Sequence, residues 1–389
     1  VRRVREKVGT NFIIIYRLSA LDLVEGGSTL DEVVQLAQAI EAAGATILNT
    51  GIGWHEARIP TIATSVPRAA FTWVTRKLRD ALRAEGITTP VITSNRINMP
   101  EVGEEVLARG DADMVSLARP FLADAEFVNK ALQGRADEIN TCIACNQACL
   151  DHTFANKLCS CLVNPRACHE TELVIRITPA KKRIAVVGAG PAGLAAATTL
   201  AERGHTVTLF DSSDRIGGQF NMAKRVPGKE EFDETLRYFA RRIEVTGVQL
   251  QLGQRVDAQR LAAQKFDEVI LATGVTPRDP KIPGQDHPQV LSYIDVLLHK
   301  KPVGRKVAIV GAGGIGFDMA EYLAHGTDLG HHSPSVDLAA WLREWGVVDP
   351  ASTRGGVVRG QPEAAAREVL LLQRKPGKHG STLGKTTGW

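Results

Sequence analysis

A glycine-rich turn, Gly188-Ala189-Gly190-Pro191-Ala192-Gly193, lies between an apolar strand and a helix and restricts the possible folds more than any other segment. The strand Arg183–Val187 precedes the turn. After the helix, a second strand, His205–Phe210, leads to Asp211, 23 residues beyond Gly188. Glycines at this spacing let the backbone approach a pyrophosphate at a helix N-terminus, and the acid binds a ribose hydroxyl. The pattern predicts a Rossmann-like nucleotide-binding domain; the alternative is a glycine turn in an unrelated α/β domain.

Two further segments favour FAD as the nucleotide in this domain. Gly217-Gly218-Gln219 is a tight turn that can pass close to a flavin, and Val269–Gly274 is an apolar strand that ends in small residues. We therefore assign FAD binding to Gly188, Gly190, Ala192, Gly193, Asp211, Gly218, Gln219, Val256, Thr273 and Gly274.

A second glycine loop, Gly311-Ala312-Gly313-Gly314-Ile315-Gly316, follows the strand Lys306–Val310. The next expected strand, Val369–Leu372, ends in Gln373-Arg374-Lys375 rather than in an acid, and cations there suit the 2′-phosphate of NADP. The alternative is that these cations belong to a solvated loop. We assign NADP binding to Gly311, Gly313, Gly316, Arg374 and Lys375. Residues 325–366 are polar and rich in Gly, Pro and Ser, and we interpret them as a partly ordered insertion with Trp341 and Trp345 on a short helix.

All six cysteines fall between Cys142 and Cys168, in a loop-rich segment. Cys142, Cys145, Cys149 and Cys161 have the spacing of three close thiolates plus a distant fourth, which suits an iron–sulfur cluster. Structural zinc sites usually show two separated CxxC pairs, so zinc is the weaker alternative. Cys159 and Cys168 are left over, and an exchange of Cys159 for Cys161 as ligand stays open.

Residues 1–135 alternate four short apolar runs with four helical patterns, which predicts four βα units with parallel strands. Their carboxyl ends carry polar residues, among them Arg17, Asn49, Arg96 and Arg119. Ligands bind at this edge in barrels and open α/β sheets, and arginine suits a phosphate or a developing anion. His55 directly follows the second strand. A lone loop histidine is usually a surface residue, but its place on this rim makes it a catalytic candidate.

Composition excludes several classes of protein. With 47 basic and 43 acidic side chains, the net charge of +4 gives no argument for nucleic acid. The apolar stretch Ile184–Ala201 is broken by three glycines and a proline, and no secretion signal is recognisable, so we expect neither a membrane span nor export. We expect a cytoplasmic protein without an obligate protein partner.

Across essentially the whole chain, the sequence resembles the bacterial-type NADPH-dependent 2,4-dienoyl-CoA reductases, in the NADH:flavin oxidoreductase (old yellow enzyme-like) family. The resemblance rests on IIIYRLS at 13–19, NTGIGWHEARIPTIA at 49–63, SLARPFLAD at 116–124, CIACNQACLD at 142–151, CLVNPRACHE at 161–170, GGQF at 217–220 and GAGGIG at 311–316.

The resemblance implies an electron relay from NADPH through FAD and a [4Fe–4S] cluster to FMN, which reduces a 2,4-dienoyl-CoA in fatty-acid β-oxidation. It implies that Arg17 stabilises the reduced FMN, that Arg96, Ala118 and Arg119 also bind FMN, and that His55 is catalytic. Glu56, Ala57 and Arg58 would contact substrate, and the cluster ligands would be Cys142, Cys145, Cys149 and Cys161.

Only four of the family's eight barrel strands are recognisable, and the upstream proton-donor tyrosine is absent from this sequence. The expected α/β architecture is therefore the C-terminal half of a TIM barrel (1–137), an iron–sulfur loop segment (138–180), an FAD domain (181–304) and an NADP domain (305–389), a fragment at both ends. The alternatives are another enoate reductase or amine dehydrogenase of the same fold, and a truncated, inactive flavoprotein fragment.

Overall fold

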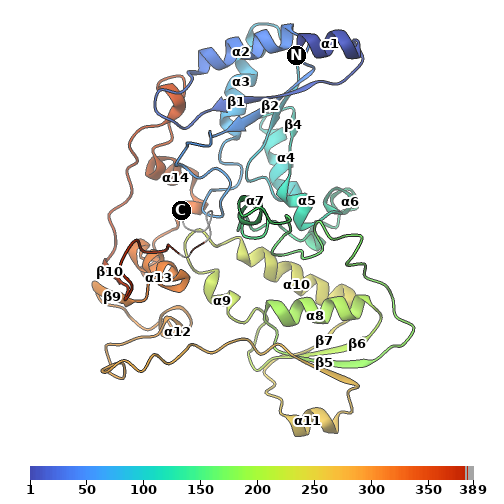
Figure 1. Cartoon of the computed structure of the whole chain (residues 1–389), viewed down its shortest axis with the longest axis vertical. Coiled ribbons are helices and arrows are strands. Elements are labelled where there is room, and N and C mark those ends of the chain that lie inside the picture. The colour runs from blue at the N-terminus through green and yellow to red at the C-terminus, as the bar shows by residue number, and fades with distance from the viewer. Residues whose placement is uncertain (382, 384–389) are drawn as a thin grey trace. The chain divides into compact units, whose positions relative to one another are not determined.

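The computed structural model describes residues 1–381 and 383 and divides the chain into two compact units (Figure 1). The first unit comprises 1–125, 144–146 and 332–365, and the remaining described residues form the second. The last residues of the expected NADP domain, 382 and 384–389, lie outside the described part. Within this part, no helix is both long and apolar enough to cross a membrane.

The first unit is built on a parallel sheet of four strands in the order β1-β2-β3-β4. Each strand pairs with the next one along the chain, and a helix separates successive strands, which confirms the predicted βα units. After β4 the chain forms two short helices, Arg119–Ala123 and Phe127–Leu132, which are separated because Asp124 adopts an extended conformation. The strands are β1 (Ile15–Leu21), β2 (Ile47–Ile52), β3 (Val91–Thr93) and β4 (Met114–Val115), and the helices are α1 (Arg2–Val8), α2 (Leu30–Ala42), α3 (Thr72–Ala84), α4 (Pro100–Ala108), α5 (Arg119–Ala123) and α14 (Leu338–Trp345).

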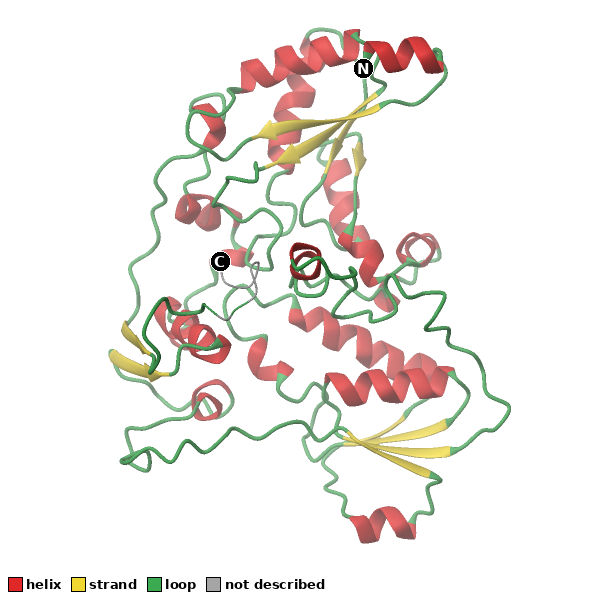
Figure 2. Ribbon diagram, viewed as in Figure 1, coloured by secondary structure: helices red, strands yellow, loops and turns green. Residues whose placement is uncertain are grey.

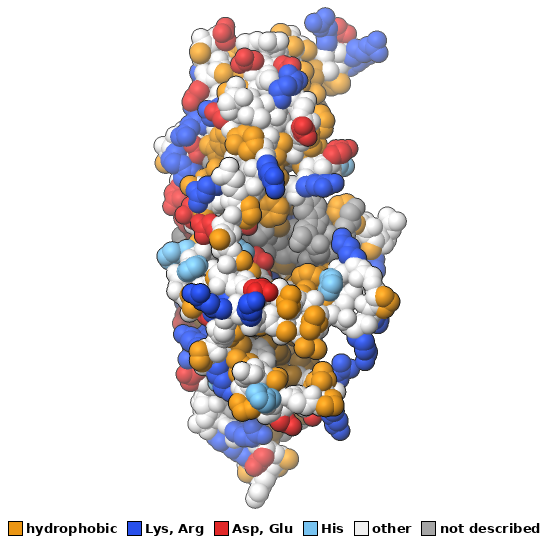
Figure 3. Space-filling model, turned by 90° about the vertical axis from the view of Figure 1, so that its left-hand side faces the viewer, with side chains coloured by type: hydrophobic (Ala, Val, Ile, Leu, Met, Phe, Trp, Pro, Cys, Tyr) orange, Lys and Arg blue, Asp and Glu red, His pale blue; other side chains and the backbone are white. Residues whose placement is uncertain are grey.

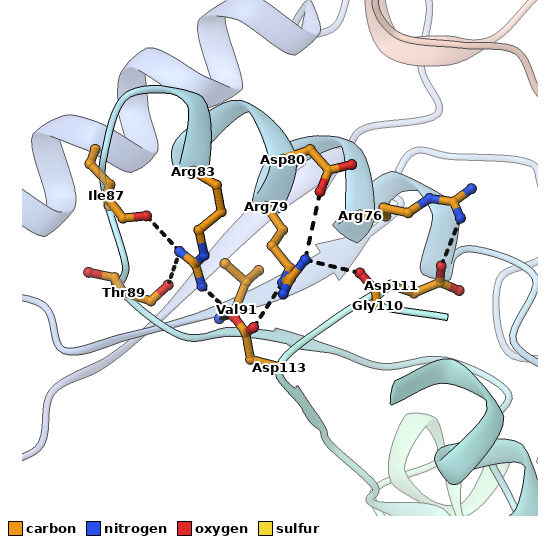
Figure 4. A network of polar contacts seen from close by, with 10 residues as sticks. All are labelled: Arg76, Arg79, Asp80, Arg83, Ile87, Thr89, Val91, Gly110, Asp111 and Asp113. Carbon is orange, nitrogen blue, oxygen red and sulfur yellow. Dashed lines mark hydrogen bonds and ion pairs between the residues drawn. The ribbon is translucent and has the colours of Figure 1, made fainter. Parts of the chain in front are cut away.

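The amino ends of strands β3 and β4 are held by arginines of α3 (Figure 4). Arg79 Nε and Arg83 Nη2 each donate to the Asp113 carboxylate at 2.8 Å, and the Val91 backbone N–H donates to it at 2.9 Å. Burial alone would raise the pKa of Asp113, but these hydrogen bonds and the two positive charges lower it below its ordinary value. Because the network lies at the edge opposite the carboxyl ends of the strands, it serves stability rather than ligand binding.

The second unit contains a parallel sheet in the order β7-β6-β5-β8, the expected arrangement of a Rossmann-like fold. Helices α8 and α10 lie on one face of this sheet (Figure 2), where Leu194, Leu209 and Phe239 share one core. The strands are β5 (Arg183–Val187), β6 (Thr206–Phe210), β7 (Gln249–Gln251) and β8 (Glu268–Leu271), and the helices are α6 (Phe127–Leu132), α7 (Leu150–Phe154), α8 (Pro191–Glu202), α9 (Phe220–Ala223), α10 (Phe232–Thr246) and α11 (Ala258–Ala263).

A smaller parallel pair comes later in the same unit: β9 (Lys306–Val310) and β10 (Glu368–Leu372), with α12 (Tyr293–Leu297) before it and α13 (Gly314–His325) inside it. Val369 pairs with Val307, so the strand predicted at 369–372 is confirmed despite its long separation from the glycine loop. The segment 332–365, interpreted from sequence as an insertion in the NADP domain, groups with the first unit because its apolar side chains join that unit's core.

Candidate functional site

The first glycine loop has the backbone that its sequence predicts. Gly188 has a φ of 108°, which side chains rarely adopt, and a Cβ there would collide with the Ala272 carbonyl. A Cβ at Gly193 would overlap the Gly188 carbonyl, so only glycine lets α8 pack this closely against β5. Nothing lies within 4 Å of a Cβ built on Gly190. The loop therefore presents open space beside the N-terminus of a 12-residue helix, where a pyrophosphate fits.

Asp211 at the end of β6 organises the same loop. Its carboxylate accepts hydrogen bonds from the backbone N–H groups of Ala189 at 2.6 Å and Ser213 at 2.7 Å. The Gly217 N–H donates to the Ala189 carbonyl at 2.7 Å, and Gln219 Nε2 donates to the Val275 carbonyl at 2.8 Å. The first glycine loop, Asp211 and the turn Gly217-Gly218-Gln219 thus lie close together, and Thr273 and Gly274 are exposed beside the loop. Val256 is half-buried and makes none of these hydrogen bonds.

The second glycine loop repeats this geometry. Gly311 has a φ of 125°, a Cβ on Gly316 would overlap the Gly311 carbonyl, and nothing lies within 4 Å of a Cβ on Gly313. The Gly311 N–H donates to the Leu372 carbonyl at 2.9 Å, which brings the end of β10 beside the loop. Arg374 and Lys375 come shortly after β10 and are exposed. Arg374 and Lys375, which the sequence assigned to NADP, thus follow the strand whose end lies beside this loop.

In the first sheet, Arg17 on β1 is in register with Asn49 on β2, and each is the third residue of its strand rather than the strand end expected from sequence. The guanidinium of Arg17 extends along Gly51, since a Cβ on that glycine would lie 3.5 Å from Arg17 Nε. Asn49 Oδ1 and Thr64 Oγ1 are buried and have no hydrogen-bond partner among the described residues. Buried polar atoms without partners are rare in folded proteins, so the position of Asn49 on β2 fits a polar ligand such as the FMN expected here.

The loop after β2 exposes His55, Glu56 and Arg58 and buries Ala57 and Ile59. Beside it, the Trp54 N–H donates to the Asp22 carbonyl at 3.0 Å, and the Trp54 indole donates to Ser19 Oγ at 3.2 Å. The candidate catalytic histidine is therefore exposed on a loop whose neighbouring residues are fixed by β1 and its continuation.

Two predicted FMN ligands have protein partners. Arg96 is buried with a left-handed backbone, and its Nε donates to the Val66 carbonyl at 2.7 Å. Arg119, next to the exposed Ala118, donates to the side chain of Asn146. Asn146 lies between two of the cysteines, is buried, and has a φ of 61°. Asn146 was not among the predicted site residues, although asparagine is one of the few residues that adopt a left-handed turn readily.

Three of the four predicted cluster cysteines interact within the second unit. Burial raises the pKa of the Cys161 thiol to about 11, the backbone N–H groups of Val163 and Asn164 donate to it, and Cys142 and Cys149 lie close enough to raise its pKa further. The Ser160 N–H donates to the Ala148 carbonyl at 2.8 Å, which joins the two arms of the loop. Cys145 falls in the tripeptide 144–146 that groups with the first unit.

The six cysteines are all free thiols. In the described part of the chain, no group of three or more Cys, His, Asp or Glu side chains could hold a metal ion as it stands. The donor set nevertheless fits an iron–sulfur cluster chemically, since it offers thiols and backbone N–H groups that donate to sulfur. A bound cation would favour the thiolate that burial now disfavours.

Arg237 on α10 binds the segment that directly precedes the first cysteine, and it was not among the residues predicted from sequence. Its Nη2 donates to the Ile139 carbonyl at 2.7 Å and to Thr141 Oγ1 at 3.0 Å, directly before Cys142. No local pattern marks an arginine whose partners lie about a hundred residues away along the chain.

On the face shown in Figure 3, basic and acidic side chains are interspersed and form no single basic patch.

The chain combines a parallel βα sheet with two glycine loops, each of which lies between a strand and a helix. These features are typical of a multidomain α/β nucleotide-binding protein. Residues 1–138 match the NADH:flavin oxidoreductase / NADH oxidase family, and residues 182–351 match the pyridine nucleotide-disulphide oxidoreductase family. Each part of the chain is thus similar to a family of flavin or nicotinamide nucleotide oxidoreductases, which supports flavin and nicotinamide nucleotide binding.

Curated relatives include a metal reductase of Desulforamulus reducens, 38% identical over 83% of this chain and 48% of the relative. An NADH oxidase of Thermoanaerobacter brockii is 37% identical over 83% of this chain and 50% of its own length. Among solved structures, a 2-naphthoyl-CoA reductase in complex with 2-naphthoyl-CoA has a TM-score of 0.79 and 34% identity, covering 83% of this chain and 49% of that one. The chain thus spans about half the length of the curated relatives it matches.

Proposed function

We propose that this chain belongs to a flavin-dependent NADPH oxidoreductase that reduces a conjugated C=C bond of a 2,4-dienoyl-CoA thioester. The observation that carries the proposal is that the Arg17 guanidinium extends from β1 to Gly51, near the end of β2, and that the loop with His55 follows this strand, in a chain that also holds two glycine loops. The similarity to a 2-naphthoyl-CoA reductase supports an acyl-CoA thioester as the substrate class.

Bound FAD, [4Fe–4S] cluster and FMN would supply hydride acceptance from NADPH, single-electron transfer and hydride donation, respectively. The glycine loops at 188–193 and 311–316 would hold the two dinucleotides, and Cys142, Cys145, Cys149 and Cys161 would hold the cluster. The Arg17 guanidinium would stabilise negative charge at the carboxyl edge of β1. His55, exposed on its loop, would polarise or protonate the substrate.

The cluster assignment is tested with protein produced anaerobically from the complete reading frame. Cys145→Ser should lose the iron and the visible absorbance of the cluster while NADPH still bleaches the FAD. Cys168→Ser is the matched control, because Cys168 is exposed and is not a predicted ligand. Full iron content in Cys145→Ser, or wild-type protein that is yellow and free of iron, would show that the cluster assignment is wrong.

The substrate assignment is tested by turnover with a 2,4-dienoyl-CoA. His55→Asn should lower kcat about a hundredfold, the usual range for loss of a general acid, without changing NADPH-driven flavin reduction. His299→Gln, at an exposed position remote in sequence from the rim, is the control. Equal turnover by His55→Asn and the control would exclude His55 from the chemistry.

A second candidate is reduction of a free unsaturated carboxylate. It is favoured by a cinnamate reductase of Clostridium sporogenes that is 30% identical over 83% of this chain. Competition between cinnamate and a 2,4-dienoyl-CoA in one assay distinguishes the two, because a CoA-thioester enzyme should turn over the dienoyl-CoA with the higher kcat/KM.

A further inference from the structure

Residues 332–365 belong to the first unit by packing, although the chain places them between α13 and β10 of the second. Their helix α14 begins after Asp337, whose side chain caps the Ala340 N–H at 3.0 Å, and ends before Gly346, which has a φ of 68°. Within it, Trp341, Leu342 and Trp345 lie at the spacing of one helix face. A short amphipathic helix of this kind needs an apolar surface to cover.

That surface is the core beneath the loop after β2. Trp341 is 1% exposed, and its ring meets Phe71 edge-on at 5.7 Å between ring centroids. The same core contains Ala57 and Ile59, the two buried residues of the loop that exposes His55, Glu56 and Arg58. The indole therefore packs in the apolar layer on which the candidate catalytic loop rests.

Backbone hydrogen bonds join the segment to the same region. The Leu23 N–H donates to the Gly355 carbonyl at 2.8 Å, and the Gly355 N–H donates to the Ser28 carbonyl at 2.9 Å. Leu23 is buried with a φ of 58°, a conformation that a leucine keeps only when its surroundings enforce it. A Cβ at Gly355 would overlap the Val24 carbonyl, so the close approach needs a glycine there.

The contacts continue from this point to His55. Asp22, beside Leu23, is buried, and its carboxylate accepts from the Ser28 N–H and from Ser19 Oγ, each at 2.6 Å. Its carbonyl accepts from the Trp54 N–H at 3.0 Å, and Trp54 immediately precedes His55. Apolar packing and backbone hydrogen bonds thus reach the loop from the same segment.

We infer that residues 332–365, with Trp341 as their anchor, position the His55 loop of the first unit, although the chain enters and leaves this segment from the second unit. Trp341 is a positioning residue, since it acts through Ala57, Ile59 and Phe71. The inference rests on the function proposed for the His55 loop, and it adds a role for a segment outside both glycine loops.

The test uses amide hydrogen exchange in protein from the complete reading frame, which requires no substrate. The Gly53 N–H donates to the Leu21 carbonyl at 2.8 Å and the Ala57 N–H donates to the Trp54 carbonyl at 3.1 Å, so both amides should be protected. Trp341→Leu should speed exchange in the peptide that contains 53–59 by about tenfold or more, as expected for local opening. Trp341→Phe, which keeps an aromatic ring on Phe71, should restore most of the protection.

Leu78→Ala is the matched control, because Leu78 is fully buried in the other core cluster of the same unit. Leu78→Ala should lower the free energy of unfolding of the first unit without a selective rise in amide exchange at residues 53–59. Equal exchange at 53–59 in Trp341→Leu and wild type, or the same rise in Leu78→Ala, would overturn the inference.

Turnover measurements separate this inference from the proposed function. Trp341→Leu should lower kcat/KM for the dienoyl-CoA about tenfold, in proportion to the opened loop population, while NADPH-driven flavin reduction stays unchanged. If exchange responds but wild-type protein reduces no dienoyl-CoA, the proposed function fails and the positioning role stands. If the substrate is reduced but neither exchange nor kcat/KM responds to Trp341→Leu, the positioning role fails.

Discussion

The two glycine loops are nearly identical in backbone, but the chain takes different routes after them. In both, the first glycine has a strongly positive φ, the second faces open space, and the third contacts the carbonyl of the first. After the first loop the chain returns directly to the neighbouring strand β6 and Asp211. After the second loop, residues 332–365 belong to the core of the first unit, and the chain then forms β10, which pairs with β9 and is followed by Arg374 and Lys375.

The two routes indicate that the loop geometry is local, whereas the residues that follow the next strand come from wherever the chain returns. Glycines determine the turn between the strand and the helix, because only glycine fits the positive φ and the close contact with a carbonyl. The charge that faces the ribose comes from the end of the next strand, however far away it lies in sequence. Two contacts in the second unit join the residues that flank the segment 332–365. The Ala366 N–H donates to the Ala324 carbonyl at 2.8 Å, and Arg367 forms an ion pair with Asp328 at 2.7 Å.

The third glycine of each loop should be the most sensitive position. Gly193→Ala should abolish FAD retention and destabilise the second unit by about 3 kcal/mol, because the new Cβ overlaps a backbone carbonyl that cannot move. Gly316→Ala should weaken NADPH binding and leave FAD content intact. Flavin content and urea unfolding measure both; normal FAD in Gly193→Ala would show that the loop can relax.

The second glycine should separate binding from folding. Gly190→Ala and Gly313→Ala place a Cβ in open space, so unfolding free energies should change by less than about 0.5 kcal/mol. Affinity for the nucleotide should nevertheless fall about tenfold or more, because the backbone can no longer approach the pyrophosphate. Titration calorimetry or flavin release measures this. Unchanged affinity would mean that the nucleotides do not lie against these glycines.

Charges at the strand ends should set the choice of nicotinamide nucleotide. Replacing both Arg374 and Lys375 with Gln should raise the KM for NADPH about tenfold and leave the KM for NADH nearly unchanged, since only NADPH carries the 2′-phosphate. The comparison with Asp211→Asn is informative, because that change should affect FAD retention and not this preference. Equal changes for NADPH and NADH would assign the two cations to a solvated loop.

The ion pair between the segment 332–365 and α2 should contribute least to the stability of the first unit. Arg354 donates to both carboxylate oxygens of Glu32 at 3.0 Å, and both side chains are about half exposed. Solvent and salt screen such a pair, so Glu32→Gln should shift the urea midpoint of the first unit only slightly, and less still at high salt. A shift as large as that of Trp341→Leu would show that charge rather than apolar packing anchors the segment.

Much of the site could be predicted from sequence because its signals are local. Strand β5, strand β9 and both glycine loops lie where the spacing of apolar residues and glycines predicted them. The candidate FAD residues around Gly188 and Asp211 also converge, because a βαβ unit brings consecutive strand ends to one edge. By contrast, Asn146 and Arg237 act through partners that are distant in sequence, and no local pattern identifies such partners.

Periodicity and backbone sterics were enough to predict the parallel βα architecture and the two glycine turns, since both are properties of short stretches of sequence. They could not show that residues 332–365 complete the core under the His55 loop, or that Arg96 bonds the Val66 carbonyl; these contacts emerged only from packing in three dimensions. The burial of apolar surface is non-directional. Two tryptophans on a short helix therefore indicate that the helix needs a partner, but not which surface provides it.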